Sequence, residues 1–440
     1  MQASLDLGYF PRSFRAPSTV VMPKLGKPDY TRSKAYWPIA LENTMGKVFE
    51  SVITEILSYL TETYRLLPDH HYGGRPGRST EDALVILSEN IHKAWRQKKV
   101  FSAVFFDVAG AFNNVHHKRL LHNLRKCQIP VKIVNWLQGS LQQRSTKLLF
   151  NGAKSNDIPI PAGIPQGSPL SPLLYMYYNA ELLEVQPKLS PHAGLALGFI
   201  DDVVYGAQGR SAKYNIQNLM HMLNGTEGWR KRHGAQFEWS KYILVHFTHN
   251  RQQMTDASLK IDKIVIQPSK EARYLGVVFD QELRFKCHIQ QAIRKGTSAL
   301  NRIANCHLGA PYQQICQLFQ AVVAPRLDYA AVIWNRPKAD CSMAGLAHSR
   351  SFATIQRIAV RAALACYQTA PTAAMEMESG LQPTWIRLQH KALTSVARMQ
   401  SLSIHHPIHA YISKALRTCT TCSPHTTILE NIFSQFPMMM

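Results

Sequence analysis

The chain has 440 residues, of which 45% are hydrophobic, so it is long enough for two or three packed domains and too apolar to be disordered. Its 50 Lys and Arg residues outnumber its 28 Asp and Glu residues, which gives a formal net charge of +22. That excess is large for an enzyme of small molecules and favours a polyanionic partner, with nucleic acid as the first candidate. The sequence shows neither an apolar run of about 18 residues nor a signal-peptide pattern, so no membrane segment is expected.

The first part of the chain is basic and rich in proline. Residues 1–37 are expected to form loop and short strand, and residues 41–63 carry apolar side chains at helical spacings of three and four. A glycine-rich turn with Arg75 and Arg78 then leads to a helix whose capping box begins at Ser79. Such a turn before a helix is either a phosphate cradle or an ordinary helix-entry loop.

Carboxylates follow two predicted strands. The apolar run at residues 100–106 predicts a buried central strand that ends at Asp107, and two short apolar runs on either side of Asp201 and Asp202 predict a hairpin with the acids at its tip. Because successive strand residues point to opposite faces, one acid of this pair should make the main contact. Two carboxylates about 4 Å apart repel by about 4 kcal/mol at an effective dielectric near 20, so a site that gathers them needs cations such as a pair of divalent metals. A solvated Asp-Asp turn is the alternative.

The remaining pattern mixes strands with helices and then becomes helical. A rigid Pro- and Gly-rich loop at residues 163–172 precedes a helix, because Ser171 can cap it and Pro172 suits its first position. The other predicted elements are helices from about residue 116 and over 131–141, 173–184 and 212–232, and strands over 242–247 and 273–279. From residue 282 the apolar spacing is helical, so we expect an α+β fold with one unit over 1–280 and a second, helical unit over 281–440.

The eight cysteines are scattered and are expected to be reduced thiols. Cys419 and Cys422, with His425 nearby, suggest a zinc site, but the spacing offers no clear fourth ligand. An incidental pair of cysteines is therefore the expectation.

Four segments, taken in order, resemble motifs of the reverse transcriptase region of non-LTR (LINE-type) retrotransposons, and look most like fungal elements of that class. They are the first polymerase motif at 105–112, the second at 163–172, the aromatic-x-Asp-Asp box at 199–202 and the primer-grip hairpin at 274–277. Residues 36–39 and 72–80 are similar to the fingers segments of the family. The resemblance implies a right-hand polymerase, with fingers and palm over 1–280 and a helical thumb and connection region over 281–440.

The resemblance also implies RNA-directed DNA polymerase activity with two Mg²⁺ ions, for which Mn²⁺ could substitute. In that scheme Asp107 and Asp201 bind the metals, the carbonyl of Val108 is a further ligand, and Asp202 supports the site. Lys241 matches the lysine of a further motif and is a candidate general acid for the departing pyrophosphate. An exposed surface lysine is an equally simple interpretation of Lys241.

Further residues are implied to bind substrate. Phe112 would lie beneath the incoming sugar and exclude a 2′-hydroxyl, although a plain core aromatic is the alternative. Gln166 and Gly167 would touch the nucleotide and the template, and Arg75 and Arg78 would face phosphates. The implied partners are an RNA template, a DNA primer or target DNA, deoxynucleoside triphosphates, and the RNA of the element in a ribonucleoprotein. The implied location is intracellular, in the nucleus after a cytoplasmic ribonucleoprotein stage.

The sequence also departs from the family pattern. Trp37 stands where the family usually has Arg, which predicts weaker triphosphate binding. Neither the upstream endonuclease nor an RNase H pattern is found, so a fragment of a longer polyprotein, or a decayed copy, is expected. Two alternatives stay open: a catalytically inactive RNA-binding remnant, and a group II intron-type reverse transcriptase and maturase.

Overall fold

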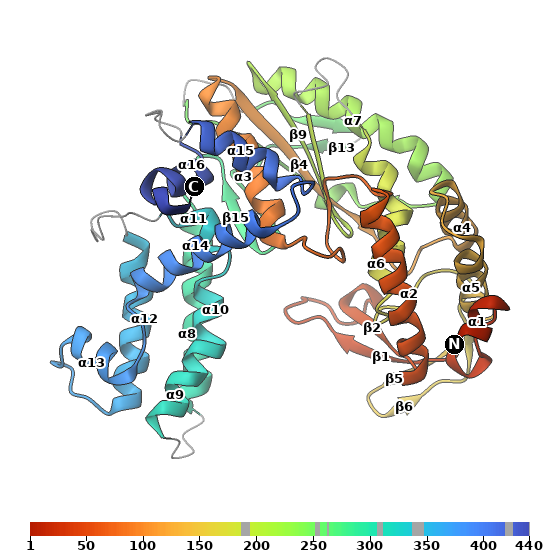
Figure 1. Cartoon of the computed structure of the whole chain (residues 1–440), viewed down its shortest axis with the longest axis horizontal. Helices are drawn as coiled ribbons and strands as arrows, with labels where there is room; N and C mark the ends of the chain where they lie inside the picture. Colours follow the sequence, from red (N-terminus) through yellow and green to blue (C-terminus); the bar gives the residue numbers. More distant parts are fainter. Residues whose placement is uncertain are drawn as a thin grey trace.

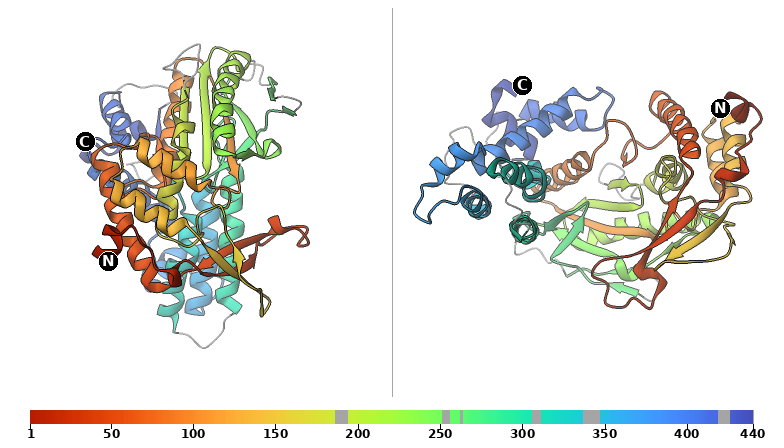
Figure 2. Two further views of the ribbon diagram at one scale, coloured as in Figure 1. Left: turned by 90° about the vertical axis from the view of Figure 1, so that its right-hand side faces the viewer. Right: turned by 90° about the horizontal axis from the view of Figure 1, so that it is seen from below.

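The structure is a computed structural model that describes residues 1–185, 194–250, 256–261, 264–305, 311–336, 347–418 and 426–439. A central sheet lies between an N-terminal part that mixes strands and helices and a C-terminal part that is helical (Figure 1). Seen from below, these two parts lie on opposite sides of the central sheet (Figure 2). The mixture of sheets and helices confirms the predicted α+β class. No helix among these residues is both long and apolar enough to cross a membrane.

The N-terminal part holds a small sheet of order β2-β1-β5-β6, with β7 also paired to β5. Strands β1 and β5 run parallel, and the other pairs are antiparallel. Its elements are α1 (Gln2–Asp6), β1 (Ser18–Pro23), β2 (Tyr36–Leu41), α2 (Thr44–Thr63), α4 (His117–Lys126), α5 (Val131–Leu141), β5 (Ser145–Phe150), β6 (Ala153–Lys154) and β7 (Ile158–Pro159). Helix α2 begins where the side chain of Asn43 accepts hydrogen bonds from two backbone N–H groups of the first turn.

The central sheet has the order β10-β4-β9-β8-β3, and β11 also pairs with β4. Its strands are β3 (His71–Tyr72), β4 (Val100–Ala109), β8 (Gly194–Phe199), β9 (Asp202–Gly209), β10 (Gln236–Phe237) and β11 (Ile243–Phe247). Helices α3 (Thr80–Arg96) and α7 (Ala212–His233) pack against it, and α6 (Ser171–Asn179) shares a hydrophobic core with β4. Phe101 and Phe105 of β4 join the core that contains α3, whereas Val104 and Phe106 join the core that contains α4 to α7. Strand β4 is thus covered on both faces, which confirms the predicted buried strand.

Two hairpins and a run of helices complete the chain. The strands are β12 (Leu259–Ile261), β13 (Ile264–Ile266), β14 (Glu271–Tyr274) and β15 (Val277–Asp280). The helices are α8 (Lys286–Asn305), α9 (Tyr312–Leu318), a π-helical turn (Phe319–Val323), α10 (Ala324–Leu327), α11 (Ala331–Trp334), α12 (Ala347–Leu364), α13 (Thr372–Ser379), α14 (Thr384–Ser401), α15 (Ile408–Thr418) and α16 (Ile428–Gln435). The last strand ends at Asp280 and α8 begins at Lys286, close to residue 282, from which the apolar spacing predicted helices.

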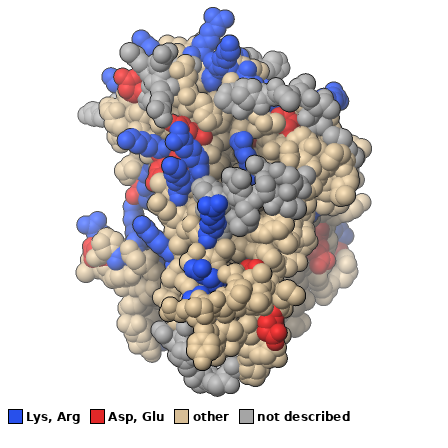
Figure 3. Space-filling view, turned by 90° about the vertical axis from the view of Figure 1, so that its left-hand side faces the viewer, with Lys and Arg blue, Asp and Glu red and all other residues tan. Residues whose placement is uncertain are grey.

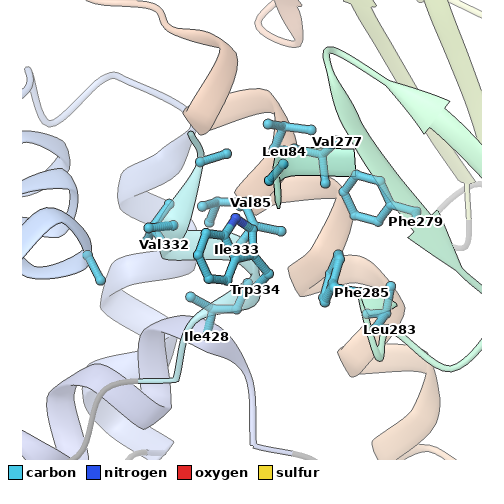
Figure 4. Close-up of a cluster of buried hydrophobic side chains, with 14 of the residues drawn as sticks. Leu84, Val85, Val277, Phe279, Leu283, Phe285, Val332, Ile333, Trp334 and Ile428 are labelled. Atoms are coloured by element: carbon cyan, nitrogen blue, oxygen red, sulfur yellow. The ribbon is translucent and has the colours of Figure 1, made fainter. Parts of the chain in front are cut away.

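The C-terminal helices return to α3 and share its core. Leu84 of α3 lies near Val277 of β15, while Trp334 of α11 and Ile428 of α16 enter the same cluster (Figure 4). One hydrophobic core therefore crosses residue 280, and the division into units at 1–280 and 281–440 stays a prediction.

Candidate active site

The three predicted carboxylates meet at one end of the central sheet. Asp107 of β4 lies directly opposite Asp202, the first residue of β9. Strand β8 ends at Phe199, so Ile200 and Asp201 form a two-residue turn between β8 and β9. The predicted hairpin with the acids at its tip is therefore correct. Which of Asp201 and Asp202 makes the main contact stays a prediction.

The turn that carries these acids is held by its neighbours. Ile200 adopts a left-handed backbone conformation with φ 56°, which is costly for a branched residue. Asn179 of α6 donates a hydrogen bond of 2.7 Å to the Ile200 carbonyl, and the Ile200 N–H donates to the Tyr72 carbonyl at 3.1 Å. A Cβ on Gly73 would lie 2.7 Å from the Ile200 side chain, so only glycine fits there. The glycine-rich turn thus supports the carboxylate hairpin.

The carboxylates repel one another in a partly buried setting. Burial raises the pKa of Asp202 to about 6, and the charges of Asp201 and Asp107 add to this effect. Burial also raises the pKa of Asp201, again with a contribution from Asp107. The Oδ1 atom of Asp107 is buried and accepts no hydrogen bond from any residue that the structure describes. A buried carboxylate oxygen without a donor, close to two further acids, is a fitting ligand for a cation.

No three His, Cys, Asp or Glu side chains among the described residues are gathered closely enough to enclose a metal ion by themselves. Mg²⁺ commonly keeps several waters and binds through one or two carboxylates together with substrate phosphates. The facing carboxylates therefore suit Mg²⁺ without a complete cage of protein ligands.

Lys241 lies beside Asp107, and its role as a general acid stays a prediction. Its Nζ is 3.8 Å from Asp107 Oδ2 and 2.7 Å from Glu238 Oε2. The hydrogen bond to Glu238 is the main cause that raises the pKa of Lys241, and the charge of Asp107 adds to it. Glu238 also lies 3.5 Å from Nζ of Lys34. Sequence reasoning missed Glu238, although its spacing of three residues from Lys241 could have indicated the pair.

Phe112 is half-buried against an aromatic residue of α6. Its ring stacks on that of Tyr175, with centroids 5.3 Å apart and an interplanar angle of 22°. Tyr175 is fully buried, and burial, followed by the charge of Asp201, raises the pKa of its hydroxyl well above the usual range. The ring of Phe112 thus stacks on a tyrosine whose hydroxyl is influenced by the charge of Asp201. Sequence reasoning missed Tyr175, for which the aromatic run at residues 175–178 was the available signal.

The loop at residues 163–172 is joined to the segment that carries Phe112. The N–H of Ile164 donates to the Phe112 carbonyl at 2.8 Å, and the Gln166 carbonyl accepts from Ala40 at 2.8 Å. Gly167 has φ +129°, and a Cβ there would lie 2.6 Å from the Ala40 carbonyl oxygen. Gln166 also lines a cavity of about 220 Å³ between this loop and strands β1, β2 and β5. Gln166 and Gly167 are thus close to Phe112, and their contacts with nucleotide or template stay predictions.

A buried pair of acidic side chains, Glu50 and Glu42, helps to hold the loop at residues 163–172 in place. Ser168 donates a hydrogen bond to the carboxylate of Glu50 on α2, and it accepts one of 3.1 Å from the N–H of Leu170. Burial, with the neighbouring Glu42, raises the pKa of Glu50 to about 7. Arg144 lies 3.3 Å from Glu42 and compensates part of this charge. A lone Glu in a predicted helix gives no sequence signal for such a role.

The predicted phosphate role of Arg75 and Arg78 disagrees with their positions. Arg75 forms two hydrogen bonds to the carboxylate of Glu62, of 2.7 and 3.0 Å, and donates to two backbone carbonyls. Four of its five N–H groups are thereby used inside the protein. Arg78 donates to the Asp69 carbonyl, and its guanidinium lies 5.3 Å from the ring centroid of Tyr72. Both side chains are buried, so in this structure they brace the glycine-rich loop instead of facing a phosphate.

Three further predictions concern the primer-grip hairpin, Trp37 and the possible zinc ligands. The primer-grip resemblance lies on the β14–β15 hairpin, where burial, followed by the charge of Asp202, raises the pKa of Tyr274 far above the usual range. Trp37 is exposed on β2, and Nζ of Lys24 lies 5.8 Å from its ring centroid. The possible zinc ligands at 419, 422 and 425 lie outside the described residues.

Comparisons with known proteins agree with this geometry. The sequence model of the family described as reverse transcriptase (RNA-dependent DNA polymerase) matches residues 24–279. The probable RNA-directed DNA polymerase from transposon BS of Drosophila melanogaster is 28% identical over 67% of this chain and 32% of its own length. The RNA-directed DNA polymerase from mobile element jockey of the same species is 25% identical over 75% of this chain and 36% of its own length.

Solved structures of telomerase are also similar. Apo telomerase from Candida tropicalis has 10% sequence identity, covers 92% of this chain and 70% of its own chain, and gives a TM-score of 0.46. Telomerase from Candida albicans, in complex with a fragment of telomeric RNA, has 11% identity and a TM-score of 0.44, with 96% of this chain and 67% of that chain covered.

The chain spans about a third of the length of the curated relatives it matches, 32% of one and 36% of another. These relatives come from insects, so the expected fungal origin stays a prediction. The family match covers more than half of the chain and contains all three carboxylates. The chain therefore belongs to the reverse transcriptase (RNA-dependent DNA polymerase) family, and the predicted resemblance to non-LTR retrotransposon reverse transcriptases is confirmed.

Proposed function

We propose that this chain is the polymerase part of an RNA-directed DNA polymerase that extends a DNA primer on an RNA template. The proposal rests on the position of three carboxylates at one end of the central sheet, those of Asp107, Asp201 and Asp202. All three lie within the residues that match the family model. The proposed substrates are deoxynucleoside triphosphates and the 3′ end of a primer or of target DNA.

In this proposal Asp107 and Asp201 hold two Mg²⁺ ions, or Mn²⁺ in their place, with the Val108 carbonyl as a further ligand. The unpartnered Oδ1 of Asp107 and the raised pKa of Asp201 support this assignment. When bound, such ions activate the primer hydroxyl and neutralise the triphosphate. Asp202, opposite Asp107, adds negative charge that favours binding of the cations.

The other residues position the substrate and handle the proton. The raised pKa keeps Lys241 protonated near neutral pH, so its Nζ can donate a proton to the departing pyrophosphate, while Glu238 orients it. Phe112, backed by Tyr175, occupies the space that a 2′-hydroxyl would need. Gln166 contacts the nucleotide and template from the neighbouring loop.

The partners and the location belong to the same proposal. The net charge of +22 suits a chain that travels with the RNA of its element as a ribonucleoprotein. Assembly would occur in the cytoplasm, and DNA synthesis would occur in the nucleus, where the target DNA lies.

A primer-extension assay tests the proposed function. A labelled DNA primer annealed to an RNA template is incubated with the protein, deoxynucleoside triphosphates and Mg²⁺. We expect products that reach the end of the template, and none when the metal is chelated. A folded protein that binds the duplex but adds no nucleotide would instead be the inactive RNA-binding remnant.

A further inference from the structure

A second polar cavity lies between α3 and α15, formed by residues that are all different from those of the carboxylate site. Its volume is about 390 Å³, within the range of about 300–1,000 Å³ typical of ligand sites. The lining residues are Asp69, His70, Glu89, Asn90, Lys93, Arg96, Pro407, Ala410, Tyr411 and Lys414. The cavity exists because C-terminal helices pack back onto α3.

Three cationic side chains converge on this cavity. Arg96 is held by an ion pair of 2.6 Å with Glu430 of α16. Lys93 and Lys414 form no ion pair with any residue that the structure describes. Burial lowers the pKa of Lys414, the charges of Lys93 and Arg96 lower it further, and the charges of Glu89 and Glu430 offset part of this effect. Two unpaired ammonium groups that repel each other at a concave surface favour an anionic ligand between them.

The cavity also presents polar groups that are not cationic. Glu89 is buried and accepts a hydrogen bond of 3.2 Å from the N–H of Leu429. Asn90 donates a hydrogen bond of 2.9 Å to the hydroxyl of Tyr411. Asp69 is exposed, and Nδ1 of His70 has no hydrogen-bond partner among the described residues. A ligand for this cavity therefore needs hydroxyl or amide groups besides its negative charge.

Positive charge continues on the surface around the cavity. Lys and Arg side chains form a band over the upper and central part of the face on the α12–α16 side, with few acidic side chains between them (Figure 3). Exposed cations on the helices of this side include Lys391 of α14 and Arg417 of α15. An extended basic band suits a chain of phosphates better than a single small anion.

We propose that the cavity between α3 and α15 binds one nucleotide of a single RNA strand, with a backbone phosphate between Lys93 and Lys414. Single-stranded nucleic acids bind where a basic groove meets polar and aromatic side chains, and Tyr411 and Asn90 supply these here. The exposed carboxylate of Asp69 can accept a hydrogen bond from the 2′-hydroxyl that distinguishes RNA from DNA. This RNA contact does not depend on polymerase activity.

The test measures binding of a short labelled single-stranded RNA to the full chain while unlabelled primer–template duplex saturates the carboxylate site. For the double variant Lys93→Glu and Lys414→Glu we expect at least about a tenfold loss of affinity. The slope of log affinity against log salt should fall by about 0.7, since the one phosphate that the two lysines neutralise contributes about 0.7 for a single strand. Lys93→Arg with Lys414→Arg should keep both values.

Lys213→Glu, an exposed lysine on α7, is the matched control and should change the affinity little. Thermal unfolding of each variant checks that the fold is kept. The proposal is overturned if the double Glu variant binds RNA like the control, if a single DNA strand of the same sequence binds equally well, or if only binding to anionic lipid vesicles is lost. Because the readout is binding, it gives a result even if primer extension fails.

Discussion

Phe112 is the residue at which sugar selection can be tested most sharply. Its ring rests on Tyr175 and its carbonyl is bonded to the loop at residues 163–172, so its position is fixed from two sides. We expect Phe112→Val to open the space beneath the sugar, since a packed site has no other room for an additional oxygen. Ribonucleotide use should rise by about tenfold or more, while deoxynucleotide use falls modestly.

The measurement is the ratio of kcat/KM for a deoxynucleotide to that for its ribonucleotide, in wild type and in Phe112→Val. Phe150→Val, at an exposed aromatic residue of β5, serves as the control. An unchanged ratio in a folded and active Phe112 variant would place this residue in the core only.

Predictions for single residues were correct where the neighbouring sequence determines the strand or turn in which the residue lies. The apolar runs that end at Asp107 and that flank Asp201 and Asp202 predicted the strands and the turn at which these acids lie. The glycine-rich turn before α3 suggested a phosphate role for Arg75 and Arg78, but the sequence does not show that Glu62, thirteen residues before Arg75, binds the guanidinium of Arg75. Long-range pairing of this kind depends on tertiary packing.

At the scale of elements, Glu50 connects α2 to the loop at residues 163–172. Its folded-state pKa of about 7 lies above the usual pKa of 4.5 for a Glu side chain, so the folded protein retains a proton that the unfolded chain loses. The stability that this provides is complete below pH 4.5 and is lost as the pH rises through about 7. Glu50→Gln imitates the protonated form, so it should be more stable than wild type above this window and similar below it.

Urea unfolding of wild type and Glu50→Gln at about pH 5 and about pH 8 measures this difference. Glu55→Gln, on the exposed side of the same helix, is the control. A stability difference that is the same at both pH values would show that the Glu50 carboxyl is not protonated in the folded protein.

A second link between elements is the ion pair of Arg398 on α14 with Asp82, next to the N-cap residue Ser79 of α3. Removing the guanidinium leaves the fully buried carboxylate of Asp82 with fewer donors. Arg398→Met should therefore lower the free energy of unfolding by about 1–3 kcal/mol.

Thermal or urea unfolding gives this value, and Arg417→Met on the exposed surface of α15 is the comparison. Equal stability of the Arg398 and Arg417 variants would show that the pair does not tie α14 to α3.

At the scale of the whole molecule, the order of the motifs indicated the family. It did not indicate that the C-terminal helices pack back against α3. Helical periodicity located the C-terminal helices and their apolar faces. It did not indicate that Trp334 and Ile428 share a core with α3, because a stripe of apolar residues does not show which other element packs against it. The cavity between α3 and α15 is formed by this packing of C-terminal helices on α3, and therefore no sequence pattern indicated it.

The net charge of +22 predicts how binding of nucleic acid by this chain depends on salt. Binding to an RNA–DNA duplex should weaken steeply as salt rises, because each phosphate that a Lys or Arg neutralises releases a counterion. Titrations at a series of salt concentrations measure the slope. An affinity that is flat between low and moderate salt would contradict a nucleic-acid surface built on the charge of +22.

Primer extension by Asp201→Asn tests the central role of the carboxylates most directly. The substitution removes one proposed metal ligand but relieves repulsion with Asp107 and Asp202, so the fold should be kept and its stability unchanged or raised. Asp157→Asn, at an exposed acid near β7, is the matched control. We predict that Asp201→Asn loses more than about 100-fold in extension, beyond what loss of an outer-shell group costs, while it still binds the primer–template duplex. Extension by folded Asp201→Asn at the rate of the control would contradict the assignment of the active site.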